Sequence, residues 1–208
     1  MTQDHYFNAE PRVRSDPGRA RLVLPDVSLD LITDRGVFAH GHVDRGTELL
    51  LRTMPPPPTD GDLLDLGCGY GAIAIVMALR APAARVWAVD VNRRARELCA
   101  YNAASAGADN VVVTSPEDVS AELSFARLYS NPPVRLGKQQ LHELLERWLA
   151  RVRADGAANL VMLRHLGADS LASWLAGRGF VVERLRSKQG YRILEVRSPL
   201  SSGHHEAS

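Results

Sequence analysis

The sequence predicts an α/β fold: a sheet of seven mostly parallel strands with helices on both faces, preceded by a small β-hairpin extension. Three observations support this prediction. From residue 62 onward, short apolar segments alternate with segments of helical spacing, which is typical of strand–helix–strand units. Glycine-rich and proline-rich stretches follow two of the apolar segments, at strand ends where open sheets bind ligands. The last two strand-like segments are separated by a short turn and form a hairpin, which adds one reversed strand.

Residues 1–54 form an extension in front of the main body. Apolar and polar residues alternate at residues 20–24 and 28–33, which predicts two short strands. Asp44 is suited to cap a short helix over residues 45–52. The proline run at residues 55–58 then acts as a stiff linker to the body.

The main body, residues 60–197, alternates strands with helices. Strands are expected at residues 62–66, 85–90, 110–114, 126–130 and 157–163, with the hairpin at 180–185 and 191–196. Helices are expected at residues 71–79, 93–106, 139–153 and 170–177. The longest of them presents one apolar stripe, made of Leu141, Leu144, Leu145, Trp148, Leu149 and Val152. The small polar residues 198–208 predict a disordered tail.

Composition limits the classes of function. Of the 208 residues, 45% are hydrophobic and 24% are charged, which is ordinary for a globular fold. No apolar run is long enough to span a bilayer, and the start of the chain is too polar for a signal peptide. Cys68 and Cys99 lie in apolar stretches and suit a reducing compartment. We therefore expect a cytoplasmic protein with no membrane partner.

The charge of the chain is nearly balanced, with a formal net charge of +1. A protein that holds nucleic acid by charge alone would be more basic, so any nucleic-acid contact requires a local patch. Two basic stretches are candidates: Arg12, Arg14, Arg19 and Arg21 near the start, and Arg178, Arg184, Arg186, Lys188 and Arg192 near the end. The alternative is that both stretches are ordinary solvated faces.

A glycine-rich loop follows the first strand of the body. Gly67 and Gly69 stand where the backbone turns sharply and a ligand must approach closely. The helix that follows offers free N–H groups and a partial positive charge. The spacing alone also fits a dinucleotide fingerprint. Asp65 favours S-adenosylmethionine, because a carboxylate at this place would repel a pyrophosphate but attract the amino group of methionine.

Further cofactor contacts are expected at the ends of the next two strands. Asp90 is placed to accept hydrogen bonds from two ribose hydroxyls. Asn92 is a candidate for a contact with the ribose or adenine, and it is equally suited to cap a helix. Asp118 is a candidate acceptor for the adenine amino group, although its loop also fits plain solvent-exposed chain.

The segment Asn131-Pro132-Pro133 follows the fourth strand and is the most informative stretch. The prolines stiffen the backbone and keep the preceding residues extended. The Asn131 side-chain oxygen and the Pro132 carbonyl are then held in place as two acceptors. Two acceptors that hydrogen-bond the N–H groups of an aromatic amino group orient its lone pair toward the methyl donor. No strong base is needed, because the nitrogen becomes acidic once it is methylated. The alternative is a merely rigid turn.

Taken together, these residues resemble the methyltransferase small-domain family, which belongs to the class I methyltransferases. The resemblance spans residues 5–197 and is carried by Gly36-Val37-Phe38, residues 43–47, residues 64–71, Asp90-Val91-Asn92 and residues 131–138. The best-known members methylate the exocyclic N2 of guanine in small-subunit ribosomal RNA. The resemblance implies S-adenosylmethionine as cofactor, no metal, and RNA as partner.

The resemblance also implies roles for single residues. Asn131 and Pro132, supported by Pro133, would hold the target amino group. Thr47 would lie near the methionine end of the cofactor, and Phe38 would act as a lid over the same cleft or, alternatively, fill a core position.

Two departures from the family pattern bear on the substrate. Relatives that methylate adenine N6 or protein glutamine have an aromatic residue in place of Val134, so its absence argues against those substrates. Arg135 is a candidate to stack on the base through its guanidinium plane, and Lys138 to meet a phosphate. The ribosomal guanine enzymes also carry an additional N-terminal domain, for which this sequence has no counterpart.

Two other functions remain open from the sequence. The same scaffold could methylate a nitrogen of a small molecule or of a protein side chain. A non-catalytic binding module is disfavoured, because the glycine loop, the two strand-end carboxylates and the Asn-Pro-Pro segment are all present. Binding to RNA through arginine and lysine would weaken steeply with salt, whereas turnover of a small molecule would not.

Overall fold

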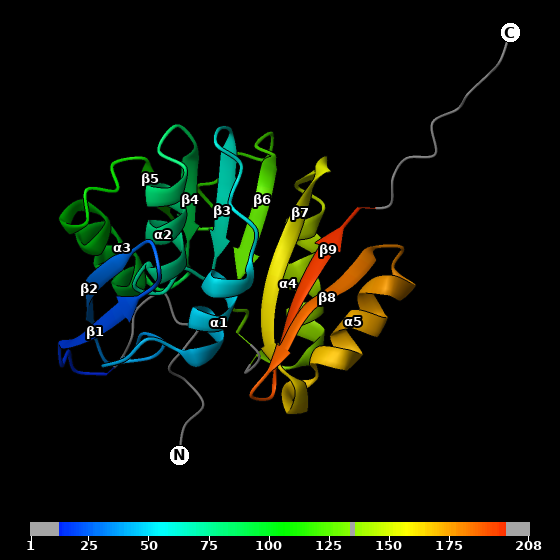
Figure 1. The fold of residues 1–208 in the computed structure, drawn as a ribbon, viewed down its shortest axis with the longest axis horizontal. Helices are drawn as coiled ribbons and strands as arrows, with labels where there is room; N and C mark the ends of the chain where they lie inside the picture. Colours follow the sequence, from blue (N-terminus) through cyan, green and yellow to red (C-terminus); the bar gives the residue numbers. More distant parts are fainter. Residues whose placement is uncertain (1–12, 134–135, 199–208) are drawn as a thin grey trace, which may run out of the picture.

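The computed structural model describes residues 13–133 and 136–198. Arg12, Val134, Arg135 and the tail from residue 199 lie outside the described residues. The central sheet is formed by β3 (Asp62–Leu66), β4 (Arg85–Val89), β5 (Val111–Thr114), β6 (Phe125–Ser130), β7 (Val152–Leu163), β8 (Val181–Lys188) and β9 (Tyr191–Arg197). Their order across the sheet is β5-β4-β3-β6-β7-β9-β8 (Figure 1).

The strand directions confirm the predicted mostly parallel sheet. Strands β3 to β7 pair in parallel, while β9 runs antiparallel to both of its neighbours, β7 and β8. The β8–β9 hairpin turns at Gln189 and Gly190, whose φ angles are +50° and +83°. Two successive residues in the left-handed region make the tight turn that matches the twist of the flanking strands.

Helices cover both faces of the sheet (Figure 1). Helices α1 (Arg45–Thr53), α2 (Ala72–Arg80) and α3 (Arg93–Ser105) share one apolar cluster with one face. Helices α4 (Lys138–Leu149) and α5 (Ala168–Gly177) share a second cluster with the other face. A short turn, η2 (Arg164–Leu166), joins β7 to α5. Among the described residues, no helix combines the length and apolar character needed to cross a bilayer.

The N-terminal extension packs onto the body through its own hairpin. Strands β1 (Gly18–Val23) and β2 (Ser28–Thr33) form a separate antiparallel pair, as predicted. The Asn102 side chain of α3 bonds both backbone groups of Ile32, at 2.8 and 2.9 Å, and also donates to the Tyr70 carbonyl at 2.9 Å. One buried amide therefore ties β2 to both α3 and the loop that precedes α2.

The predicted helix at residues 139–153 is too long at its C-terminal end. Helix α4 ends at Leu149, and Val152 belongs to β7, where it lies opposite Phe125 of β6. Val152 continues the apolar spacing of the helix, but pairing with a neighbouring strand outweighs that local pattern. The strand is irregular after this point, and a Cβ at Gly156 would lie 2.7 Å from the Ala126 carbonyl oxygen.

Candidate active site

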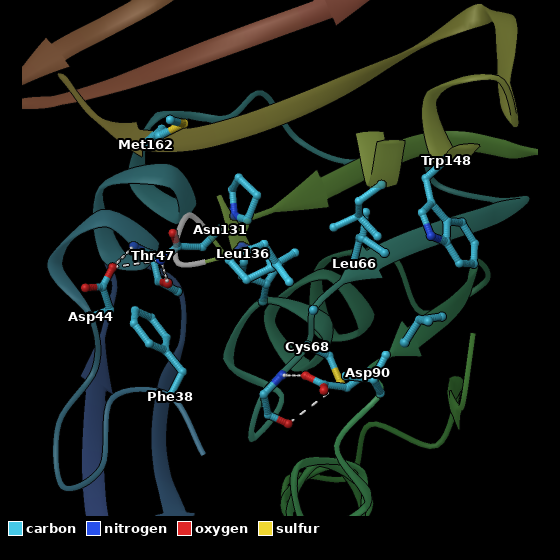
Figure 2. A pocket seen from close by; sticks show the side chains of 18 of the residues that line it. Phe38, Asp44, Thr47, Leu66, Cys68, Asp90, Asn131, Leu136, Trp148 and Met162 are labelled. Carbon is cyan, nitrogen blue, oxygen red and sulfur yellow. Dashed lines mark hydrogen bonds between the residues drawn. The ribbon is translucent and has the colours of Figure 1, made fainter. Parts of the chain in front are cut away.

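A cavity of about 590 Å³ opens at the carboxyl ends of the parallel strands. Its volume lies within the roughly 300–1,000 Å³ that is typical of small-molecule sites. The lining includes these residues named from the sequence: Phe38, Thr47, Gly67, Gly69, Asp90, Asn131, Pro132 and Pro133. In Figure 2, Asp44, Thr47 and Asn131 lie together at one end of the cavity, and Asp90 and Trp148 lie toward the other.

The glycine loop forms part of the cavity wall. Gly67 and Gly69 have φ angles of +77° and +55°, in the left-handed region that favours glycine. A Cβ at Gly67 would meet nothing within 4 Å, because the backbone there faces open space. Gly71, also left-handed, is held for a different reason: a Cβ there would lie 2.8 Å from the Cys99 sulfur. The first two glycines thus expose backbone to a ligand, while the third lets α2 pack on α3.

Asp90 follows β4 and is half-buried at the cavity. Its Oδ2 accepts from the Gly69 N–H at 3.0 Å, and its Oδ1 accepts from the Asn92 N–H at 2.8 Å. Burial raises the pKa of Asp90, while these two bonds oppose the shift. Each oxygen keeps one further lone pair, so the carboxylate can still accept hydroxyl hydrogens from a ligand.

Asn131 is oriented by two acceptors on α1. Its side-chain nitrogen donates to Asp44 Oδ1 at 2.8 Å and to Thr47 Oγ1 at 3.0 Å (Figure 2). A carboxylate oxygen accepts hydrogen bonds and does not donate them, so the amide nitrogen must face Asp44. Asn131 lines the cavity, and its amide oxygen is the acceptor that remains for a ligand.

The Asp44 oxygen that meets Asn131 also begins the helix. It accepts from the backbone N–H groups of Gly46 at 2.8 Å and Thr47 at 3.0 Å, which caps α1. Tyr191 of β9 packs directly on this turn, since a Cβ at Gly46 would lie 2.6 Å from the Tyr191 ring. Glycine at position 46 therefore allows β9 and α1 to close one wall of the cavity.

Phe38 also lines the cavity and is 39% exposed. The structure therefore does not place it in the core, which was the alternative left open by the sequence.

Asp65 does not line the cavity. It is fully buried beneath α2, where its Oδ2 accepts from the Ala74 N–H at 2.9 Å. Its Oδ1 has no hydrogen-bond partner among the described residues. Burial raises the pKa of Asp65 to about 8, and the nearby charge of Asp90 adds to that shift. The expected direct contact with the methionine amino group is therefore not supported.

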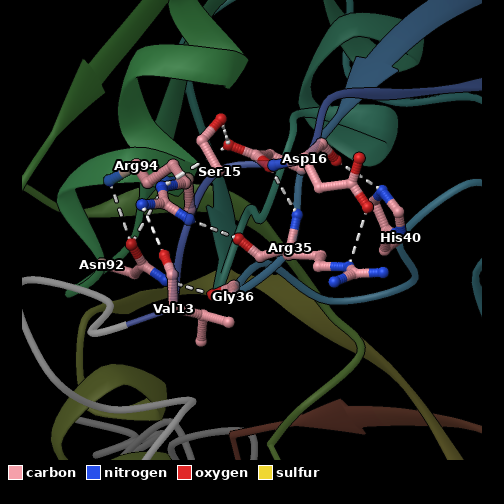
Figure 3. Close-up of polar contacts among 10 residues, drawn as sticks. Val13, Ser15, Asp16, Arg35, Gly36, His40, Asn92 and Arg94 are labelled. Carbon is pink, nitrogen blue, oxygen red and sulfur yellow. Dashed lines mark hydrogen bonds and ion pairs between the residues drawn. The ribbon is translucent and has the colours of Figure 1, made fainter.

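Asn92 is occupied as a helix cap, the alternative left open for it. Its side-chain oxygen accepts from the Arg94 N–H at 3.0 Å and the Ala95 N–H at 3.3 Å, and its nitrogen donates to the Gly36 carbonyl at 2.8 Å (Figure 3). It is 4% exposed and does not line the cavity. This residue therefore holds the loop that carries Phe38 against α3.

Two other predicted contacts also lie outside the cavity lining. Asp118 is exposed and accepts from the Ser115 hydroxyl at 2.7 Å, while Pro116 of the same loop lines the cavity. Lys138 is the exposed first residue of α4. Arg135 lies outside the described residues.

Several lining residues were not predicted as site residues. Asp44 was assigned only as a helix cap, and Tyr191 only to a strand. Trp148 was placed in the apolar stripe of α4, but it lines the cavity and its buried indole N–H has no acceptor among the described residues. Local sequence patterns carry no signal for these roles, since each depends on contacts with distant segments. Nowhere in residues 13–133 and 136–198 do three potential metal-ligating side chains gather.

Comparisons with known proteins identify the family. The family described as the methyltransferase small domain matches residues 28–195. A protein of Bacillus subtilis, YbxB, is 31% identical over 197 residues, which cover 93% of this chain and 98% of that protein. The ribosomal RNA small subunit methyltransferase C of Pseudomonas aeruginosa is 36% identical over 143 residues, covering 69% of this chain and 43% of that enzyme. The Pseudomonas putida enzyme is 33% identical, covering 94% and 59%. This chain therefore spans about half the length of these curated methyltransferases.

Solved structures agree in fold. A 16S rRNA N2 methyltransferase of T. thermophilus, in complex with AdoMet and guanosine, matches with a TM-score of 0.74 and 22% identity, covering 90% of this chain and 52% of that one. A precorrin-6y C5,15-methyltransferase of Geobacter metallireducens matches with a TM-score of 0.63 and 16% identity, covering 80% and 93%. With the family match and the cavity at the strand ends, the predicted fold and enzyme class are confirmed. The chain belongs to the methyltransferase small-domain family and is an S-adenosylmethionine-dependent methyltransferase.

Proposed function

We propose that this enzyme methylates the exocyclic N2 amino group of a guanine in ribosomal RNA. The observation that carries the proposal is the orientation of Asn131. Its amide nitrogen is held by Asp44 and Thr47, which leaves the amide oxygen as an acceptor at the cavity. An acceptor there suits a substrate that presents N–H bonds, as an exocyclic amino group does.

The second acceptor is the Pro132 carbonyl, which follows Asn131 in the rigid Asn-Pro-Pro segment. Two acceptors on one amino group favour a tetrahedral nitrogen and restore the lone pair that the aromatic ring would otherwise delocalise. Neither acceptor needs to act as a strong base, because the nitrogen becomes acidic once it is methylated. The contribution of these residues is orientation and preorganised dipoles, with Pro133 keeping the segment rigid.

The residues of the cavity fit the predicted cofactor. Asp90 keeps lone pairs for two ribose hydroxyls, and Gly67 and Gly69 leave room for the methionine portion beside the N-terminus of α2. The Trp148 indole N–H is a buried donor without a partner in the part of the chain that the structure describes, and a nitrogen of the adenine ring would supply the acceptor. When bound, S-adenosylmethionine supplies an electrophilic methyl group. Thr47, which already accepts from Asn131, would lie near its methionine end.

We propose that Phe38 covers the target base. Phe38 is the exposed aromatic side chain of a loop that faces the cavity, so it can close over a flat group as a lid. We also propose that Lys138 contacts an RNA phosphate and that Arg135 stacks on the base. Lys138 is exposed at the start of α4 and makes no ion pair with a described residue, so its charge is available to a phosphate.

The relatives favour RNA as the substrate. The methyltransferases of Pseudomonas aeruginosa and Pseudomonas putida named above are ribosomal RNA enzymes, and the T. thermophilus structure holds guanosine beside AdoMet. A ribosomal substrate would place this enzyme in the cytoplasm, and both buried cysteines are free thiols, as a reducing compartment would keep them.

The test is transfer of the methyl group from S-adenosylmethionine to small-subunit ribosomal RNA by the purified protein, with the RNA digested and its nucleosides analysed by mass spectrometry. N2-methylguanosine is expected. RNA from cells that lack the protein should be the better acceptor, because its target site is unmodified. Transfer to adenosine, to protein or to small molecules, with none to guanine, would contradict the proposal and favour another nitrogen substrate on the same scaffold.

A further inference from the structure

Basic residues lie on the segments next to Tyr191, which lines the cavity. Tyr191 begins β9 and lines the cavity, and Lys188 is its partner across the β8–β9 hairpin. Arg164 donates its backbone N–H to the Gly190 carbonyl of the same hairpin at 2.8 Å. Arg45, at the start of α1, directly precedes Gly46, and a Cβ at Gly46 would lie 2.6 Å from the Tyr191 ring. We call four side chains around this point the basic rim: Arg45, Arg164, Arg186 and Lys188.

The charges of the basic rim are not neutralised. All four side chains belong to exposed residues, and none makes an ion pair within residues 13–133 and 136–198. The other basic residues of this region are paired. Arg178 meets Glu146 at 2.5 Å, while Arg184 and Arg192 meet Asp169 at 3.7 and 3.4 Å. The basic stretch seen in the sequence is therefore divided into a neutralised group and a free group.

A β-bulge makes this division. Arg184 lies opposite Leu194, but after a register shift Arg186 lies opposite Ile193. Leu194 packs in the apolar cluster of α4 and α5, whereas Ile193 packs in the cluster of α1 to α3. Cross-strand partners share a face of the sheet, so Arg184 faces α5 while Arg186 and Lys188 turn to the face of α1. Strict alternation would have kept all three on the face of Arg184.

We infer that the basic rim binds the phosphate backbone of a single-stranded RNA segment whose target base enters the cavity beside Asn131. This inference rests on the proposed guanine-N2 activity and extends it to how the RNA is held. Four basic residues of α1, η2 and β8, none of them ion-paired with a described residue, lie on segments next to Tyr191, in a chain whose net charge is only +1. Exposed carboxylates such as Asp60 and Asp109 stand just before β3 and β5, at the amino ends of these strands.

The shape of the site favours RNA over an acidic protein segment. A single strand offers a flat base for the cavity and, on the far side of the sugar, a charged backbone for the rim. Phosphates along the strand match cations that are spread over three elements better than one compact carboxylate does. The rim therefore supplies, from within this domain, the local positive patch that the nearly balanced net charge requires.

The test compares two double variants with equal loss of charge. Arg186→Gln/Lys188→Gln removes half of the rim. Arg85→Gln/Arg153→Gln removes two exposed arginines, at the start of β4 and near the start of β7, of which Arg153 pairs with Asp155. Binding of a fluorescent, single-stranded, guanine-containing RNA is measured by anisotropy over a series of KCl concentrations. The rim variant should bind about tenfold more weakly at low salt, and the slope of log Kd against log salt should fall by about 1.4.

The control variant should match the wild-type protein in both affinity and slope. Equal effects of the two variants, or no binding of RNA by the wild-type protein, would overturn the inference. So would an equal loss of affinity for polyglutamate, because the rim would then be a general anion surface. The assay requires no methyl transfer. If RNA is bound through the rim but is not methylated on guanine, the proposed function is contradicted, while the inference that the rim binds RNA is still supported. Matching melting temperatures of the variants establish that each is folded.

Discussion

Asp44 accepts a hydrogen bond from the Asn131 side-chain nitrogen across 2.8 Å, although the two residues are 87 positions apart. The same carboxylate oxygen caps α1 through the N–H groups of Gly46 and Thr47. One atom therefore begins a helix of the N-terminal extension and sets the amide orientation of the proposed catalytic residue. The extension is in this way part of the candidate active site.

Asn131→Ala should lower turnover by about a hundredfold or more, because it removes one of the two proposed acceptors for the target amino group. Affinity for S-adenosylmethionine should stay nearly unchanged. Turnover is measured by methyl transfer to RNA, and affinity by calorimetry. Comparable turnover in the variant would refute the role proposed for Asn131.

Asp44→Ser should lower turnover by about tenfold with little change in melting temperature. Serine is as good a helix cap as aspartate, so α1 keeps its N-terminus, but the shorter side chain cannot reach Asn131. Asp44→Asn keeps an acceptor oxygen of the same length and should recover most of the turnover. If the serine and asparagine variants show the same kcat, Asp44 does not act through the orientation of Asn131.

Asp90→Ala should weaken binding of S-adenosylmethionine by at least about tenfold, since two hydroxyl contacts to a carboxylate are lost. Calorimetric titration measures the change. Asp60→Ala is the matched control, because Asp60 is an exposed carboxylate just before β3, at the amino end of that strand and outside the cavity lining. Unchanged affinity in the Asp90 variant would remove the proposed ribose contact.

Trp148→Phe should weaken cofactor binding by about fivefold, because the aromatic ring stays while the indole donor is lost. Trp174→Phe serves as control, since Trp174 stacks on His142 outside the cavity. Fluorescence or calorimetric titration gives both affinities, and thermal unfolding checks that the two variants are folded. Equal affinities in both would show that the indole N–H of Trp148 does not meet the cofactor.

Asp65 should make the cofactor-free protein less stable as the pH rises. Burial raises its pKa from 3.8 to about 8, so between these values the folded state binds more protons than the unfolded state. The stabilising contribution is complete below about pH 3.8 and is lost as the pH rises to about 8. Burial raises the pKa of Asp90 as well, which acts in the same direction.

Asp65→Asn removes this titration while keeping the shape of the side chain. Melting temperatures recorded from pH 5 to 9 should therefore favour the variant increasingly as the pH rises, with the difference levelling off above about pH 8. A constant difference across this range would mean that Asp65 is ionised throughout, contrary to the effect of its burial.

Local patterns in the sequence were sufficient for the fold and for the approximate position of the site. The strand–helix alternation and the terminal hairpin gave the sheet, because side-chain periodicity reports directly on which face of an element is buried. The glycine loop and the Asn-Pro-Pro segment were recognisable because each constrains its own backbone. Both follow parallel strands, whose carboxyl ends must meet at one edge.

Side-chain partnerships, by contrast, were decided by the folded chain. Sequence spacing grouped Arg184 with Arg186, but a bulge in β8 turned them to opposite faces. The sequence predicted that Asp65 contacts the cofactor, yet its side chain is buried beneath α2. Asn92 was a candidate for a cofactor contact, but its side chain caps α3. The pairing of Asp44 with Asn131 is also invisible in either segment alone. The physical reason is common to all of these: backbone preferences act over a few residues, whereas hydrogen-bond partners, burial and charge neutralisation depend on segments that meet only after folding.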